Sequence, residues 1–161
     1  MIKFLSTLLI FSFLSINAFA FQFQDYYWGQ HLKETMPIVA RKAAPQKNDT
    51  DQFIILAYED NIAGKPCQVF LNFSRLSQSL SAATVLWKTP VAGTSMKNSI
   101  ENKYGKPSKK EINPKKGVSR SYTWKGRAEN EVIILEMGSD YTKAVYFGGE
   151  FYNIAEQEML K

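Results

Sequence analysis

Histidine and cysteine, which often serve as base and nucleophile, occur only once each in this 161-residue chain. His31 is the only histidine, so a Ser-His-Asp or Cys-His mechanism would have to use it as the base. The serine motif G-x-S-x-G is absent, and Cys67, the only cysteine, lies on a different expected element. His31 and Glu34 alone do not make up a zinc ligand set. We therefore interpret His31 as a surface or helix-capping residue, and we expect no metal and no cofactor.

Paired carboxylates could supply a general acid and a general base without histidine, as in glycoside hydrolysis. The candidate pairs are Asp49 with Asp51, Glu59 with Asp60, and Glu129 with Glu131. All lie in expected loops or at strand edges, where solvation gives no reason for one carboxyl to keep its proton. The glycines form neither G-x-G-x-x-G nor G-x-x-x-x-G-K, the two common phosphate cradles.

The segment from Lys103 to Arg127 has the strongest local net charge, because it contains nine basic residues and a single acid, Glu111. Gly105-Lys106-Pro107 and Asn113-Pro114-Lys115-Lys116-Gly117 are loop signals, so we expect an exposed, mobile and protease-sensitive loop. Such a loop either stays solvated or binds an anionic lipid headgroup, a cell-wall polymer or an acidic protein. The residues expected to contact the anion or partner are Lys106, Lys109, Lys110, Lys115, Lys116 and Arg120.

A second candidate surface is aromatic and consists of Tyr26, Tyr27 and Trp28. Three successive residues cannot all face inward on a strand, because side chains alternate between its two faces. At least one of them is therefore exposed or covers an edge. The row is either an aromatic interface, since exposed Tyr and Trp anchor many interfaces, or the cover of one end of the core.

The first twenty residues indicate export. Met1-Ile2-Lys3 is followed by an apolar run from Phe4 to Ile16 and by the small-x-small site Ala18-Phe19-Ala20. We expect residues 1–20 to be a signal peptide cleaved after Ala20, since the apolar run is too short for a membrane anchor. The mature chain then has no transmembrane segment and no expected nucleic-acid partner. It would be periplasmic in a Gram-negative bacterium and otherwise secreted.

The mature chain shows a helix, three strands, a second helix and three more strands. The first helix lies near residues 32–43, kinked at Pro37 or beginning near Thr35, and Gln46 to Gln52 is a polar loop. The second helix begins at Ser95 and stops at Gly105. Asn153 and Glu156 fit a capping box for a short C-terminal helix. The expected strands are 53–58, 67–73, 80–87, 119–125, 131–137 and 141–147.

These elements predict a single α+β domain over residues 21–161, in which two helices cover one face of an antiparallel sheet. The order of elements repeats, with pseudo-repeats of about 28–90 and 91–150. Trp124 and Ile134 should be buried on neighbouring strands of the second half. Cys67 lies in a strand pattern, where a free cysteine usually behaves as a small buried apolar residue. The alternatives for an odd cysteine in an exported protein are an intermolecular bridge or a reactive thiol.

A family resemblance rests on Trp28-Gly29, on Lys103-Tyr104-Gly105-Lys106-Pro107 and on Trp124. This pattern resembles small exported bacterial proteins of unknown function, whose two-repeat layout is similar to the β-lactamase-inhibitor-protein-like architecture. His31 departs from it, since such sequences usually carry a capping Ser two residues after the Gly. The disulfides of the inhibitors are also absent, so the resemblance implies a fold and an envelope setting but no β-lactamase inhibition.

The sequence therefore predicts an exported envelope protein that acts as a non-enzymatic binding or interaction module. A sheet face or the basic loop would bind an unknown protein or an anionic envelope component. The alternatives are a hydrolase that uses carboxylates on envelope polymers and a structural subunit of an envelope assembly.

Overall fold

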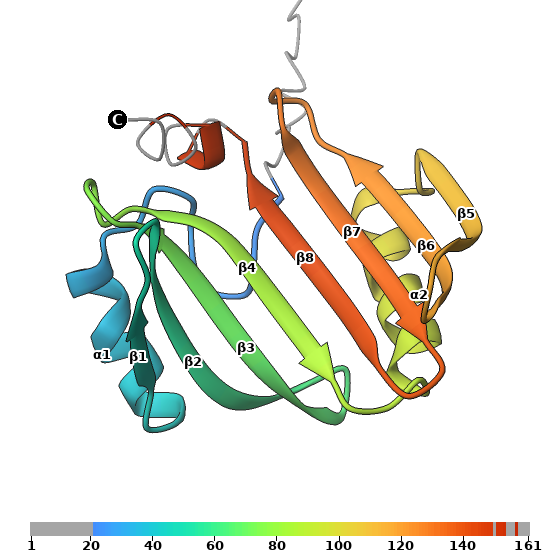
Figure 1. The fold of residues 1–161 in the computed structure, drawn as a ribbon, viewed down its shortest axis with the longest axis horizontal. Helices are drawn as coiled ribbons and strands as arrows, with labels where there is room; N and C mark the ends of the chain where they lie inside the picture. The colour runs from blue at the N-terminus through green and yellow to red at the C-terminus, as the bar shows by residue number, and fades with distance from the viewer. Residues whose placement is uncertain (1–20, 150, 154–156, 158–161) are drawn as a thin grey trace, which may run out of the picture.

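The computed structural model describes residues 21–149, 151–153 and 157, which form one eight-stranded antiparallel sheet with helices on one side (Figure 1). In chain order the elements are α1 (Leu32–Lys42), β1 (Gln46–Asp49), β2 (Phe53–Ile62), β3 (Lys65–Ser74), β4 (Leu80–Trp87), α2 (Ala92–Tyr104), β5 (Lys109–Lys115), β6 (Val118–Lys125), β7 (Glu131–Gly138) and β8 (Thr142–Gly148). The expected signal peptide lies outside the described residues.

The strand order is symmetric about the centre of the sheet. It runs β1-β2-β3-β4-β8-β7-β6-β5, so each half is a helix followed by four strands that pair with their neighbours in sequence. The last strands of the two halves, β4 and β8, pair antiparallel from Ala82 with Phe147 to Trp87 with Thr142. The two halves therefore share one continuous sheet.

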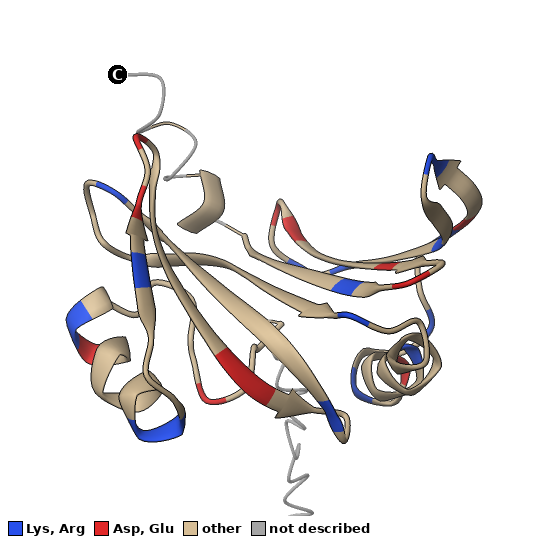
Figure 2. Cartoon of the chain, turned by 60° about the horizontal axis from the view of Figure 1, so that its bottom comes forward, with Lys and Arg blue, Asp and Glu red and all other residues tan. Residues whose placement is uncertain are grey.

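The prediction of an α+β sheet covered by two helices was wrong. Each half has four strands instead of three, because the polar segments assigned to loops contain the edge strands β1 and β5. Eight strands about 4.8 Å apart span about 34 Å, which two helices about 10 Å wide cannot cover. The helices α1 and α2 lie apart on one side of the sheet, and the irregular segment 21–31 lies between them (Figure 2).

The core lies between the sheet and this layer of helices and irregular chain. Leu56, Val69, Leu71 and Leu135 have no exposed surface, and the N-terminal segment adds aromatic rings beneath β8. Cys67 is buried, as its strand pattern indicated.

The register of β7 differs by one residue from the predicted one. Trp124 is buried on β6 as expected, but its partner on β7 is Ile133, which has no exposed surface. Ile134 is half-buried on the opposite face. Because successive side chains alternate, a slip of one residue exchanges the two faces, so the prediction for Ile134 was wrong.

The remaining differences between the predicted and the observed elements lie at the ends of the helices. His31 caps α1, since its Nδ1 accepts a hydrogen bond from the Lys33 backbone N–H at 3.1 Å, and Pro37 lies inside the helix. The second helix begins at Ala92, ahead of the predicted Ser95, and ends at Gly105. At the C-terminus residues 151–153 are helical, and most of the remaining predicted helix lies outside the described residues.

Within the described part of the chain, no helix has the length and apolarity to cross a membrane.

Candidate functional site: the open face of the sheet

The face of the sheet opposite α1 and α2 is the candidate functional site, and we call it the open face (Figure 2). Its side chains alternate with those of the core along each strand. Nine apolar residues on it are half-buried: Phe53, Ile55, Ala57, Phe70, Leu86, Val132, Ile134, Val145 and Phe147. Among them, Phe147 meets the ring of Tyr152 edge-on at 4.8 Å.

Strand register arranges the open face in rows that cross the whole sheet. The middle row reads Gln46, Ala57, Phe70, Thr84, Val145, Ile134, Thr123 and Lys109 from β1 to β5. A second row reads Asn48, Ile55, Asn72, Ala82, Phe147, Val132 and Lys125. From Ala57 to Ile134 the middle row is largely apolar over about 19 Å, given strands about 4.8 Å apart. Each row ends on a lysine at the β5–β6 side.

The third row is polar. It reads Glu59, Gln68, Leu86, Lys143, Glu136, Ser121 and Glu111. Glu136 is nearly buried and pairs with both Lys115 and Lys143, each at 2.6 Å. Burial raises the pKa of Glu136, but the hydrogen bonds and charges of these two lysines outweigh it, so the pKa lies below its usual value. The open face thus combines an apolar band with a polar border, in which Glu136 is paired with two lysines.

Two hollows lie along this face near β2 and β3. One of about 380 Å³ is bordered by Gln46, Ala57 and Phe70 of this face and by Tyr58 of the opposite face. The other, also about 380 Å³, is bordered by Glu59, Gln68 and Leu86 of this face and by Asp60 and Cys67 of the opposite face. Both hollows therefore extend beyond the open face.

The predicted basic loop is in fact an edge strand. Lys109 to Ile112 pair with Thr123 to Arg120, so the expectation of a mobile loop was wrong for β5. All six predicted contact residues are exposed, but the strand divides them. Lys109 lies on the open face, whereas Lys110 is paired beside Tyr122 and lies on the helix side. Two of the six also have acidic partners, because Lys109 pairs with Glu111 at 3.1 Å and Lys115 pairs with Glu136.

The three consecutive aromatic residues point in different directions. Tyr26 is buried and its hydroxyl lies 3.1 Å from that of Tyr58. Tyr27 is 57% exposed and donates its hydroxyl hydrogen to Glu34 at 2.7 Å. Trp28 is half-buried and donates its indole N–H to the Phe21 carbonyl. They do not form one aromatic surface.

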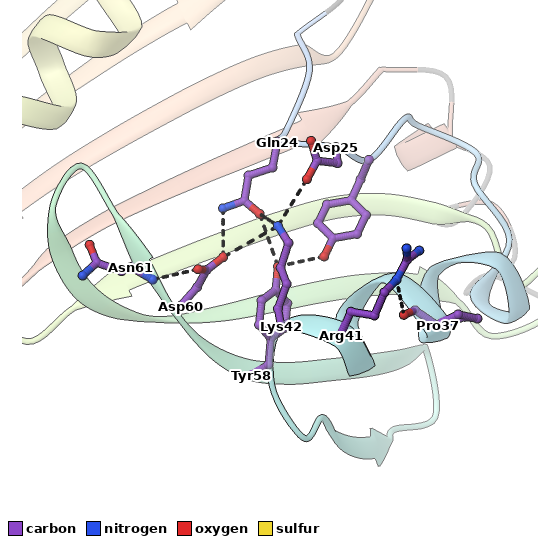
Figure 3. Close-up of polar contacts among 9 residues, drawn as sticks. Gln24, Asp25, Pro37, Arg41, Lys42, Tyr58, Asp60 and Asn61 are labelled. Atoms are coloured by element: carbon purple, nitrogen blue, oxygen red, sulfur yellow. Dashed lines mark hydrogen bonds and ion pairs between the residues drawn. The ribbon is translucent and has the colours of Figure 1, made fainter.

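A polar cluster joins the N-terminal segment, the end of α1 and β2 (Figure 3). The Lys42 ammonium lies 3.4 Å from Asp25, 3.9 Å from Asp60 and 3.0 Å from the Gln24 amide oxygen. Gln24 also donates to Asp60 at 3.2 Å. These contacts connect three segments distant in sequence, so the cluster holds the N-terminal segment against the first half.

The thiol beside this cluster is not activated. Cys67 donates to the Asp60 carbonyl at 3.4 Å, and burial raises its pKa to about 11. Burial also raises the pKa of the nearby Tyr58 hydroxyl. Both groups therefore keep their protons at neutral pH.

The candidate carboxylate pairs do not converge. Glu59 is exposed and Asp60 half-buried, and as successive strand residues they face opposite sides of the sheet. Asp49 is exposed and pairs with Lys47 at 3.1 Å. Glu131 is buried, whereas Glu129 is exposed. Within the described ranges, no group of three or more His, Cys, Asp or Glu side chains could hold a metal ion.

Sequence reasoning named a sheet face as one of two expected binding surfaces but did not identify the residues that form it, although a signal was present. Apolar residues occupy consecutive positions in β2 and β7, as in Phe53 to Ala57 and Val132 to Leu135. A strand with one solvated face should instead alternate.

No protein-family model matches the sequence, and no curated protein or solved structure is significantly similar to the chain. Its function is therefore inferred from its own surfaces.

Proposed function

We propose that this is an exported envelope protein, periplasmic in a Gram-negative bacterium and otherwise secreted, that acts as a non-enzymatic binding module. Its partner would be another protein, held on the open face. The observation that carries the proposal is the apolar band through Phe70, Val145 and Ile134, which the described helices leave uncovered. Contiguous apolar patches of a few hundred Å² commonly mark interaction sites.

The charges around the band suggest the chemistry of the partner. Lys125 ends the second apolar row, is exposed and has no acidic partner among the described residues. Lys109 ends the middle row, but its ammonium is already paired with Glu111 at 3.1 Å, so Lys125 carries the argument. The opposite ends of both rows, Gln46 and Asn48, are uncharged. A protein surface with an apolar centre and acidic residues on one side would complement this arrangement.

The proposal is tested by in-cell photo-crosslinking. A photoreactive amino acid is placed at Thr84, in the middle row, and in a matched strain at Lys33, which is exposed on α1 on the opposite side. We expect a protein adduct from position 84 only, and its loss in the Lys125→Glu variant. The adduct's partner should have an apolar surface with acidic neighbours.

Other outcomes would overturn this assignment. Equal adducts from both positions, or none from position 84, would show that the open face is not the binding surface. An adduct with a second copy of the chain would indicate self-association, as in a structural subunit. Binding only to anionic vesicles, unaffected by changes at position 84, would transfer the function to the basic residues of β5.

A further inference from the structure

The N-terminal end of the described chain is built into the fold. The side chain of Phe21 is buried, and its ring meets that of Tyr104 edge-on at 4.7 Å. The next residue, Gln22, is bound through its backbone, since the Tyr104 hydroxyl accepts from its N–H at 3.0 Å and donates to its carbonyl at 3.1 Å. The position directly after the expected cleavage site is therefore fixed in place.

The backbone nitrogen of Phe21 donates a hydrogen bond to the carboxylate of Glu131. Glu131 is only 4% exposed and opens β7. Its other oxygen accepts from the backbone N–H groups of Arg127 at 3.0 Å and Ala128 at 3.3 Å. A side chain at Gly126 would collide with this carboxylate, so the glycine leaves room for it.

Glu131 has no cationic partner among the described side chains, whose ion pairs all involve other acids. A buried carboxylate without a counter-charge is costly, even when backbone N–H groups solvate it. Its first oxygen faces the one nitrogen that cleavage after Ala20 would convert into an ammonium.

We propose that Glu131 is the receptor for the mature N-terminus. Hydrolysis of the Ala20–Phe21 peptide bond by an envelope protease adds one water, which leaves a carboxylate on Ala20 and an ammonium on Phe21. The ammonium then forms a buried ion pair with Glu131 and fastens the N-terminal segment between α2 and β7. Cleavage after Ala20 thus adds a stabilising ion pair that the uncleaved chain cannot form. This inference rests on the proposed export, because an uncleaved chain has no charge at Phe21.

The test is a four-protein thermodynamic cycle on protein expressed from the full gene and purified after export. One change inserts an alanine between Ala20 and Phe21, which moves the ammonium one residue away from the carboxylate. The other is Glu131→Gln, and the third variant combines both. Glu129→Gln, an exposed acid in the same turn, is the matched control. Intact mass establishes the first residue of each protein.

We expect each single change to lower the melting temperature by about 10 °C, as for a broken buried ion pair. The double variant should lose little more than either single one, because both remove the same interaction. Glu129→Gln should melt like the unmodified protein. Additive losses, or an unchanged melting temperature after the insertion, would overturn the receptor role.

If Glu131→Gln does not fold, a second measurement tests whether the Phe21 ammonium is paired with Glu131. Labelling of the Phe21 α-amine by an amine-specific reagent should be at least about tenfold slower in the native protein than in urea, because the amine is buried and paired. Equal rates would refute the pairing. If intact mass instead shows a chain that does not begin at Phe21, the proposed export site is wrong. If intact mass confirms that the chain begins at Phe21 but the losses in melting temperature are additive, only the receptor role of Glu131 is rejected.

Discussion

Two adjacent isoleucines on β7 show how side-chain alternation divides this sheet. Ile133 is fully buried against Trp124, whereas Ile134 lies in the middle row of the open face. We expect Ile133→Ala to cost about 2–5 kcal/mol of unfolding free energy, since it leaves a cavity in the core. Ile134→Ala should cost less than half as much, because solvent can occupy the space. Urea unfolding of both variants measures this, and equal losses would show that the open face is covered.

Glu136 provides a prediction about pH. Because its pKa is lowered in the folded protein, it stabilises the fold above the unfolded-state pKa of about 4.3, and this stabilisation is lost as pH falls through the folded-state value. Glu136→Gln should therefore lower the melting temperature at pH 7, and the difference from wild type should shrink below about pH 4.3. Glu111→Gln is the control, since its pair with Lys109 is largely exposed and should contribute little. A pH-independent difference would contradict the prediction.

At the scale of elements, the sequence predicted six of the eight strands and both named helices, and it missed the two edge strands. The segments QKND and KKEINPK contain almost no apolar residues, so they show no period of two. Their backbones are held by pairing with β2 and β6. This pairing depends on the neighbouring strands, so the residue pattern within each short segment does not predict it. The lysines and Pro114 that suggested a loop are typical of protected edge strands.

The end of α2 depends on a glycine in a conformation that other residues avoid. Gly105 has φ 84° and ψ −171°, although a side chain there would meet no atom within 4 Å. Gly105→Ala should thus cost about 1–3 kcal/mol from the backbone alone. Gly105→Asn should give no rescue, because this region differs from the left-handed helical one that Asn tolerates. Thermal melts measure both, with Asn102→Ala, an exposed change on α2, as control. A neutral Gly105→Ala would mean that the helix ends differently.

At the scale of the whole molecule, the candidate site follows from how the halves join. The open apolar band exists because β4 and β8 pair and bring Thr84 beside Val145, a contact between residues far apart in sequence. Neither half's pattern specifies this pairing. The residue types were visible in the sequence, but the surface they form required the topology.

The N-terminal segment should make the two halves unfold together. Phe23 is buried and its ring lies 5.2 Å from that of Tyr146 on β8, while Tyr26, three residues on, meets Tyr58 on β2. Phe23→Ala removes a contact from the middle of this layer and should cost about 3–5 kcal/mol.

Because both halves share one sheet and pack against the same N-terminal segment, the loss of stability should be equal on both sides of the β4–β8 pair. Hydrogen exchange of core amides tests this at Leu71 on β3 and Leu135 on β7. Both should exchange at least about a hundredfold faster in Phe23→Ala, and neither should change in Tyr27→Ala, whose side chain is 57% exposed in the same segment. Faster exchange at only one of the two amides would mean that each half opens independently, with the N-terminal segment belonging to that half alone.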